Sequence, residues 1–272
     1  MIGTSTYAPI TRHLFFTVIA LIFALSTLAQ KLPNKQTVGL RAPAKVKIDG
    51  KDTEWHNQFQ AYNNATEVFY TMANDDVNVY FTIQATDPFI INRIMSGGIT
   101  LTFQKTNKKD DKSGITLTYP VTETSLYFSL RKKKNAEEDT TAKTADSLMK
   151  HNNALIAKNC KWIRITGIPG VDTLTSVYNV NGIKAAGLFN NHKVYTCEFA
   201  LKLDLLKTAI TGGEMFNYHV CLNGMKNAPT IGIVLATPGN EAVMQQFADK
   251  VNAAGAQLSA PTDFWGEYKL VK

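Results

Sequence analysis

Residues 73–87 read Ala73-Asn-Asp-Asp-Val-Asn-Val-Tyr-Phe-Thr-Ile-Gln-Ala-Thr-Asp87, and their pattern decides the fold class. From Val77 to Ala85, every second residue is apolar, and the positions between them are occupied by Asn, Tyr, Thr and Gln. Successive side chains of a β-strand point to opposite faces, so this alternation predicts a strand with one apolar and one polar face.

The same alternation recurs further along the chain. It is found in residues 99–104, 115–119, 195–202 and 216–223, and a last strand is expected at 265–271. Strands with one apolar and one polar face are typical of antiparallel sheets that stack over a shared core. The sequence therefore predicts an all-β fold, an antiparallel β-sandwich.

Two segments depart from this pattern and predict helices. Residues 131–159 run from a charged, Thr/Ala-rich stretch into a short amphipathic helix, and we interpret them as a charged loop and helix insertion. Residues 240–254 predict a C-terminal helix that ends at Gly255. Its apolar face comprises Val243, Met244, Phe247 and Val251.

The first residues indicate export. An uncharged apolar run, residues 14–25, follows Arg12 and His13 and leads into Ser26-Thr-Leu-Ala29. This predicts a signal peptide at residues 1–29, with residues 30–272 as a single domain that is secreted or periplasmic. The alternative, an uncleaved membrane anchor, needs about 20 apolar residues. We expect no transmembrane segment after cleavage.

The charge of the chain does not predict a nucleic-acid site. The formal net charge is +7, but the basic run at 131–134 is followed at once by the acidic run at 137–139. Such a mixed run is typical of a solvated surface. An exported protein also rarely meets nucleic acid, so we expect no nucleic-acid partner.

The three cysteines, Cys160, Cys197 and Cys221, do not form a disulfide framework or a zinc motif. Strand parity places Cys197 with the apolar residues of its strand and Cys221 with the polar residues of another. A disulfide needs β-carbons that face each other, so we expect no bridge between these two residues. Cys197 is expected to behave as a small buried hydrophobe.

Three segments resemble a known family. They are Val46-Lys-Ile-Asp-Gly-Lys-Asp-Thr-Glu-Trp55, residues 73–87, and Tyr195-Thr-Cys-Glu-Phe-Ala-Leu-Lys-Leu203. In this order they are similar to the hallmark segments of family 9 carbohydrate-binding modules and the related DOMON-like sandwiches. The resemblance implies a jelly-roll-like sandwich from a secreted polysaccharide-degrading system. It further implies a glycan or oligosaccharide ligand held between aromatic rings, and sometimes a calcium ion.

The polar strand faces supply the candidate ligand-binding residues. These are Tyr80, Thr82, Gln84, Glu198, Asn217 and His219. Tyr80 is the candidate for stacking on a sugar ring, since aromatic planes pack against the C–H faces of sugars. Glu198 is either a ligand contact or a structural hydrogen-bond hub, because a buried carboxylate needs partners. Trp55 and Trp265 are interpreted first as core anchors, with ligand stacking as the alternative.

Asp75, Asp76 and Asp87 flank the strand at 77–85 and are the candidate metal ligands. Carboxylate oxygens are the ligands that calcium prefers. The alternative is that all three are ordinary turn aspartates. Calcium is the only metal that the sequence suggests, and no cofactor is predicted with certainty.

The sequence does not indicate catalysis. Glycoside hydrolysis needs two carboxylates on either side of a cleft, and no such pair can be assigned; G-x-S-x-G and H-E-x-x-H motifs are also missing. We therefore expect a non-catalytic glycan-binding module. Residues 94–103 lack the carboxylates that the family carries there, which favours as the alternative an envelope interaction module of the same fold that has lost the sugar slot. A third hypothesis is a DOMON-type haem bound between Met72 and His219.

Overall fold

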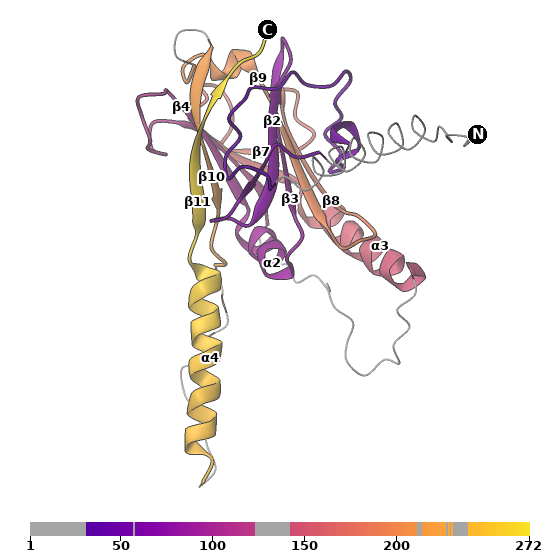
Figure 1. Ribbon diagram of the computed structural model, residues 1–272, viewed down its shortest axis with the longest axis vertical. Helices are drawn as coiled ribbons and strands as arrows, with labels where there is room; N and C mark the ends of the chain where they lie inside the picture. Colours follow the sequence, from indigo (N-terminus) through magenta and orange to yellow (C-terminus); the bar gives the residue numbers. More distant parts are fainter. Residues whose placement is uncertain are drawn as a thin grey trace, which may run out of the picture. The chain divides into compact units, whose positions relative to one another are not determined.

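Two antiparallel β-sheets make up the fold (Figure 1). The computed structural model describes residues 31–56, 58–122, 142–210, 214–226, 228, 230 and 239–272, and the description below concerns the unit formed by residues 33–272. The predicted signal peptide and the charged stretch at 131–141 lie outside the described residues.

The first sheet has five strands in the order β1-β2-β3-β9-β8. Its strands are β1 (Ala61–Asn63), β2 (Val68–Asn74), β3 (Asn78–Ala85), β8 (Ile183–Phe189) and β9 (Tyr195–Lys202). The second has six strands in the order β11-β10-β4-β5-β6-β7. Its strands are β4 (Ile99–Gln104), β5 (Ile115–Val121), β6 (Trp162–Thr166), β7 (Leu174–Ser176), β10 (Met215–Leu222) and β11 (Thr262–Lys269). The prediction of a β-sandwich with a few helices is confirmed.

Aromatic side chains from both sheets meet in the core. The hydroxyls of Tyr70 on β2 and Tyr218 on β10 are 3.0 Å apart. Tyr119 on β5 meets Phe199 on β9 edge to face, with ring centroids 6.3 Å apart. Edge-to-face pairs of this kind stabilise a core beyond the area that they bury. The apolar strand faces predicted from the alternation therefore form the contact between the sheets.

The alternation did not predict helix α2 (Pro88–Gly97), which connects β3 to β4. Its start is nonetheless encoded locally. Asp87 accepts hydrogen bonds from the backbone N–H groups of Phe89 and Ile90, and Pro88 occupies the first turn. An acidic N-cap followed by proline is a typical helix start. The helix buries Ile91 and other apolar residues against the sandwich.

The two predicted helices are present. Helix α3 (Ala142–Asn159) packs on β8, where the Asn153 side chain bonds both the N–H and the carbonyl of Phe189, each at 2.8 Å. Helix α4 (Glu241–Ser259) precedes β11. The prediction that it ends at Gly255 is wrong, because glycine is tolerated inside a helix. The actual stop is Pro261, which forces Ala260 out of the helical conformation. No helix in the described part of the chain is long and apolar enough to span a membrane.

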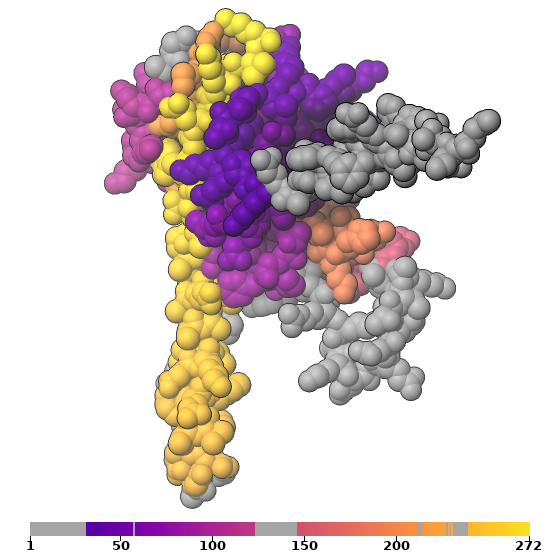
Figure 2. All heavy atoms as spheres, viewed as in Figure 1, coloured from indigo at the N-terminus to yellow at the C-terminus, as the bar shows by residue number. Residues whose placement is uncertain are grey.

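The N-terminal residues of the sandwich, coloured indigo in Figure 2, contact the outer face of the five-stranded sheet. Trp55, in the short 3₁₀ turn η2 (Thr53–Trp55), packs there against Ala73, Tyr80 and Ala200. Leu40, Ala42, Val46 and Ile48 complete this outer cluster. The five-stranded sheet is therefore covered on both faces.

Candidate functional site

Four predicted ligand-binding residues share the outer face of the five-stranded sheet. Tyr80, Thr82 and Gln84 lie on β3, and Glu198 lies on β9 directly opposite Thr82. Thr82 is 1% exposed and Glu198 is fully buried. Tyr80, Thr82 and Glu198 are buried and Gln84 is half-buried, because the segment that ends at Trp55 covers this face.

Glu198 is the hydrogen-bond hub of this covered face. Its Oε2 accepts hydrogen bonds from the backbone N–H groups of Asp49 and Gly50, at 3.0 and 2.9 Å. Its Oε1 accepts a bond from the indole Nε1 of Trp55 at 3.2 Å. Burial raises the pKa of Glu198 to about 7, against the opposing effect of these three donors. Of the two interpretations of Glu198, the structure shows the structural hydrogen-bond hub.

Two further side chains on this face bond to nearby aspartates. The hydroxyl of Tyr80 donates to Oδ2 of Asp75 at 2.7 Å. Gln84 donates from Nε2 to Asp52 at 2.8 Å and to the hydroxyl of Thr196 at 3.2 Å. This face is therefore an internal polar layer between the sheet and the N-terminal segment.

The three candidate metal ligands occupy separate places. Asp75 accepts the backbone N–H groups of Val77 and Asn78, which makes it a turn residue. Asp76 forms an exposed ion pair with Arg41 at 2.7 Å. Asp87 caps α2 at the opposite end of β3 from Asp75. From the rise per residue of a β-strand, the length of β3 separates the two aspartates by roughly 25 Å. They therefore do not form one site, and the described residues contain no group of three His, Cys, Asp or Glu side chains arranged to hold a metal.

The other two predicted residues, Asn217 and His219, lie on β10 in the six-stranded sheet. They alternate with core residues and so point to the outer face of that sheet. The six candidate residues therefore do not line one surface, because the outer faces of two stacked sheets point in opposite directions. The haem hypothesis fails on the same geometry, since Met72 is buried in the core while His219 faces outward.

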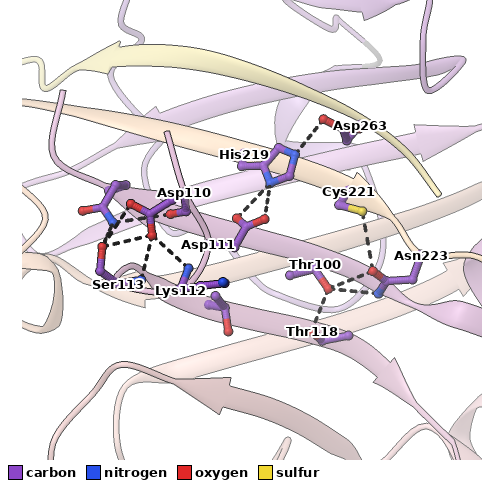
Figure 3. Close-up of polar contacts among 12 residues, drawn as sticks. Thr100, Asp110, Asp111, Lys112, Ser113, Thr118, His219, Cys221, Asn223 and Asp263 are labelled. Carbon is purple, nitrogen blue, oxygen red and sulfur yellow. Dashed lines mark hydrogen bonds and ion pairs between the residues drawn. The ribbon is translucent and has the colours of Figure 1, made fainter. Parts of the chain in front are cut away.

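His219 is the centre of the outer site of the six-stranded sheet (Figure 3). Its Nδ1 lies 2.9 and 3.1 Å from the two carboxylate oxygens of Asp111, and its Nε2 lies 2.9 Å from Oδ2 of Asp263. The arrangement is an Asp–His–Asp network that joins the β4–β5 loop to β11.

Trp265 on β11 lies directly opposite His219 and stacks on it. The ring centroids are 4.4 Å apart and the planes are 3° from parallel. Because β11 is the edge strand, the second face of the indole is turned away from β10, towards the free edge of the sheet. The site thus presents a partly exposed aromatic plane beside two carboxylates.

Asn217 holds the β4–β5 loop, which we call the lysine loop (residues 105–114). Its Nδ2 lies 3.3, 2.9 and 2.8 Å from the carbonyl oxygens of Lys105, Thr106 and Lys108. Together with the contact between His219 and Asp111, this fixes the loop over the outer face of the sheet. Two of the predicted site residues therefore act by positioning a loop.

Hydroxyl and amide groups continue the site along the sheet (Figure 3). The hydroxyl oxygens of Thr100 and Thr118 are 2.8 Å apart, and Asn223 donates to Thr100 at 2.9 Å. Cys221 lies beside them, with its sulfur 3.6 Å from Oδ1 of Asn223. On the same outer face, Trp162 on β6 is 41% exposed. The face is thus polar at its centre with a tryptophan towards either side.

The sequence did not predict the roles of Asp111, Asp263 and Trp265 at this site. Asp263 and Trp265 have the same strand parity, which places them on one face of β11. The register between β10 and β11, which sets Trp265 opposite His219, cannot be predicted from the alternation of apolar and polar residues. Asp111 belongs to a mixed charge run, and such runs usually face solvent. No protein-family model matches the chain, and no curated protein sequence matches it either.

Proposed function

We propose that this chain is an exported, non-catalytic module that binds a glycan on the outer face of its six-stranded sheet. The observation that carries the proposal is the stack of Trp265 on His219 between the carboxylates of Asp111 and Asp263. An aromatic plane beside fixed hydrogen-bonding groups is what a sugar ring needs, since it has apolar C–H faces and a rim of hydroxyls.

The two carboxylates suit the recognition of hydroxyl groups. Their side chains are 49% and 51% exposed, so each has oxygen lone pairs open to solvent. Each is also held in place by His219, whose side chain is only 8% exposed. Acceptors whose rotamers are already fixed lose little conformational entropy when a ligand binds.

The same geometry favours binding over hydrolysis. The carboxylates of a glycosidase flank the scissile bond, with the sugar between them. Here the imidazole ring of His219 occupies the space between Asp111 and Asp263. Both ring nitrogens are engaged by carboxylates, so the histidine has no nitrogen left to serve as a general base.

Affinity gel electrophoresis of residues 30–272 against a panel of polysaccharides tests the proposal. We expect retardation by at least one polysaccharide, and its loss in Trp265→Ala because the stacking plane is removed. Phe247→Ala is the matched control, since Phe247 is an exposed aromatic residue on α4 rather than on the sheet. Equal retardation of wild type and Trp265→Ala, or no retardation by any polysaccharide, would refute the proposal.

Export rests on the N-terminal sequence. When the full chain is produced in a bacterium with a general secretion pathway, we expect the protein outside the cytoplasm, with Gln30 as its first residue. Mass spectrometry of the N-terminal peptide reads this directly, whether Gln30 has a free amino group or has cyclised to pyroglutamate. Recovery of a cytoplasmic chain that begins at Met1 would contradict the signal-peptide interpretation.

A second candidate function is an envelope interaction module of the same fold. The observation that favours it is the exposure of Val243, Met244 and Phe247 on α4. Apolar side chains grouped on a helix surface are typical of contacts with another protein. A protein that binds none of the polysaccharides, but whose assembly state in envelope extracts changes with Phe247→Ser, would support this function instead.

A further inference from the structure

The lysine loop carries more positive than negative charge. It contains Lys105, Lys108, Lys109 and Lys112, against Asp110 and Asp111. Among the described residues, none of these four lysines forms an ion pair with a carboxylate. The loop therefore presents several positive charges that the protein itself does not pair.

Both aspartates of the loop are already engaged in local bonds. Asp110 accepts the backbone N–H groups of Lys112 and Ser113, at 3.1 and 3.0 Å, and the hydroxyl of Ser113 at 3.1 Å. Asp111 bonds the ring of His219. The carboxylates thus shape the loop and anchor it to the sheet.

A cavity of about 230 Å³ lies beside this loop. Polar side chains line most of it, namely Gln104, Lys105, Lys108, Ser113 and Thr208. Pockets for drug-sized ligands measure roughly 300–1,000 Å³. The cavity therefore suits a smaller group, such as one charged substituent or one ring of a larger molecule.

We propose that this cavity binds the acidic groups of a polysaccharide, so that the ligand is an acidic rather than a neutral glycan. The inference rests on the proposed function and specifies its substrate class. Lysine ammonium groups are point charges that pair with carboxylate or sulfate without a fixed geometry, and the hydroxyl of Thr208, which also lines the cavity, adds a hydrogen bond.

The positions of the two features agree with one ligand. Asp111, which contacts His219 next to Trp265, is three residues from Lys108, which lines the cavity. Three residues span at most about 10 Å of chain, so a ligand of a few sugar units is long enough to follow the lysine loop from Asp111 to Lys108. Asn217 and His219 hold the loop in place from β10, and are positioning residues for this site.

The test measures the dissociation constants of residues 30–272 for polygalacturonate, dextran sulfate and neutral galactan by affinity gels at fixed salt. We expect tighter binding to one of the acidic polymers than to galactan. The double variant Lys105→Gln/Lys108→Gln should weaken that binding about tenfold, because it removes two positive charges that line the cavity. Binding to galactan should stay unchanged. Whether polygalacturonate or dextran sulfate is preferred identifies the acidic group.

Lys47→Gln/Lys184→Gln is the matched control, because it removes the same charge from two exposed lysines outside the loop. It should leave all dissociation constants unchanged. Asn217→Ala should weaken acidic binding while keeping every lysine, because the loop loses its contacts with three carbonyls. Limited trypsin digestion of this variant should show faster cleavage at the loop lysines than in Asn181→Ala.

The outcomes separate this inference from the proposed function. If acidic and neutral polymers bind equally and only Trp265→Ala abolishes binding, the function stands and the acidic site is overturned. If both lysine pairs weaken binding alike, and DNA or anionic vesicles bind equally well, the attraction is general and the inference is also overturned. If no polysaccharide binds, both proposals fall.

Discussion

Trp55 and Glu198, 143 positions apart, are joined by a hydrogen bond of 3.2 Å from the indole nitrogen to the carboxylate. Both residues are buried, and the same carboxylate also accepts the N–H groups of Asp49 and Gly50. A single side chain of β9 therefore fastens the segment that opens the domain to the centre of the five-stranded sheet. This segment is one of the three that resemble the carbohydrate-binding modules, and in this chain it has a structural role.

Replacing Glu198 with alanine should destabilise the protein by about 3 kcal/mol, because buried N–H donors lose their acceptor. The measurement is urea unfolding followed by tryptophan fluorescence, with the free energy of unfolding as the readout. Glu214→Ala is the control, since Glu214 makes only surface ion pairs with Lys269 and Lys272. If Glu198→Ala lowers the free energy of unfolding no more than this control does, the role of Glu198 as a hydrogen-bond hub is contradicted.

The stability contributed by Glu198 should depend on pH. Burial raises its pKa from 4.5 in the unfolded chain to about 7 in the folded protein. Between these values the folded state holds a proton that the unfolded state has released. The free energy of unfolding should therefore fall by about 3 kcal/mol as the pH rises from 4.5 to 7, and then level off.

The readout for this pH effect is the difference in unfolding free energy between wild type and Glu198→Gln, from urea titrations at several pH values. Glutamine does not titrate, so the difference isolates Glu198 from other groups such as Asp75, whose pKa is lowered. A difference that stays constant from pH 4.5 to 7 would show that the carboxyl is not shifted.

Gly50→Ala should be markedly more destabilising than Gly170→Ala. Both glycines have positive φ, +80° and +75°, so both substitutions cost roughly 1 kcal/mol of backbone strain. Only at Gly50 does the added β-carbon meet backbone atoms, 2.6 Å from the nitrogen of Leu188, whereas at Gly170 it meets open space. The difference in melting temperature between the two variants isolates the effect of the steric clash, because the backbone strain is common to both. Equal losses would mean that the turn at Gly50 does not pack closely on β8.

The sandwich itself was predictable from the sequence, because strand alternation reports directly on burial. Cys197, Phe199 and Leu201 were expected on one face of their strand, and they lie in the core. Helix α2 was missed because residues 94–103 were compared with a strand of the carbohydrate-binding modules, although Asp87 and Pro88 marked the start of a helix. Local capping signals carried information that periodicity did not.

The site was only partly predictable, because polarity does not reveal which face is open. Thr82 and Glu198 have the parity of surface residues, but a segment more than 25 positions upstream of Thr82 covers them. His219 lies on the outer face of its sheet, as its strand parity predicted. Its partners Asp111 and Asp263 come from two distant segments, and this pairing is set by sheet register, which a single sequence does not contain.

The last prediction concerns the thiols. Cys197 points into the core from the five-stranded sheet, while Cys221 lies on the outer side of the six-stranded sheet, and all three cysteines are free. Burial raises the pKa of Cys160 to about 12 and that of Cys221 to about 11, and raises that of Cys197 as well. Because the thiolate is the reactive form, iodoacetamide at pH 8 should label the native protein slowly. Cys221, the least buried of the three, should react first.

The denatured, unreduced protein should show three reactive thiols by mass spectrometry. A single reactive thiol and a peptide linking Cys197 to Cys221 would mean that the two strand faces are assigned wrongly, and the outer site around His219 would then have to be abandoned.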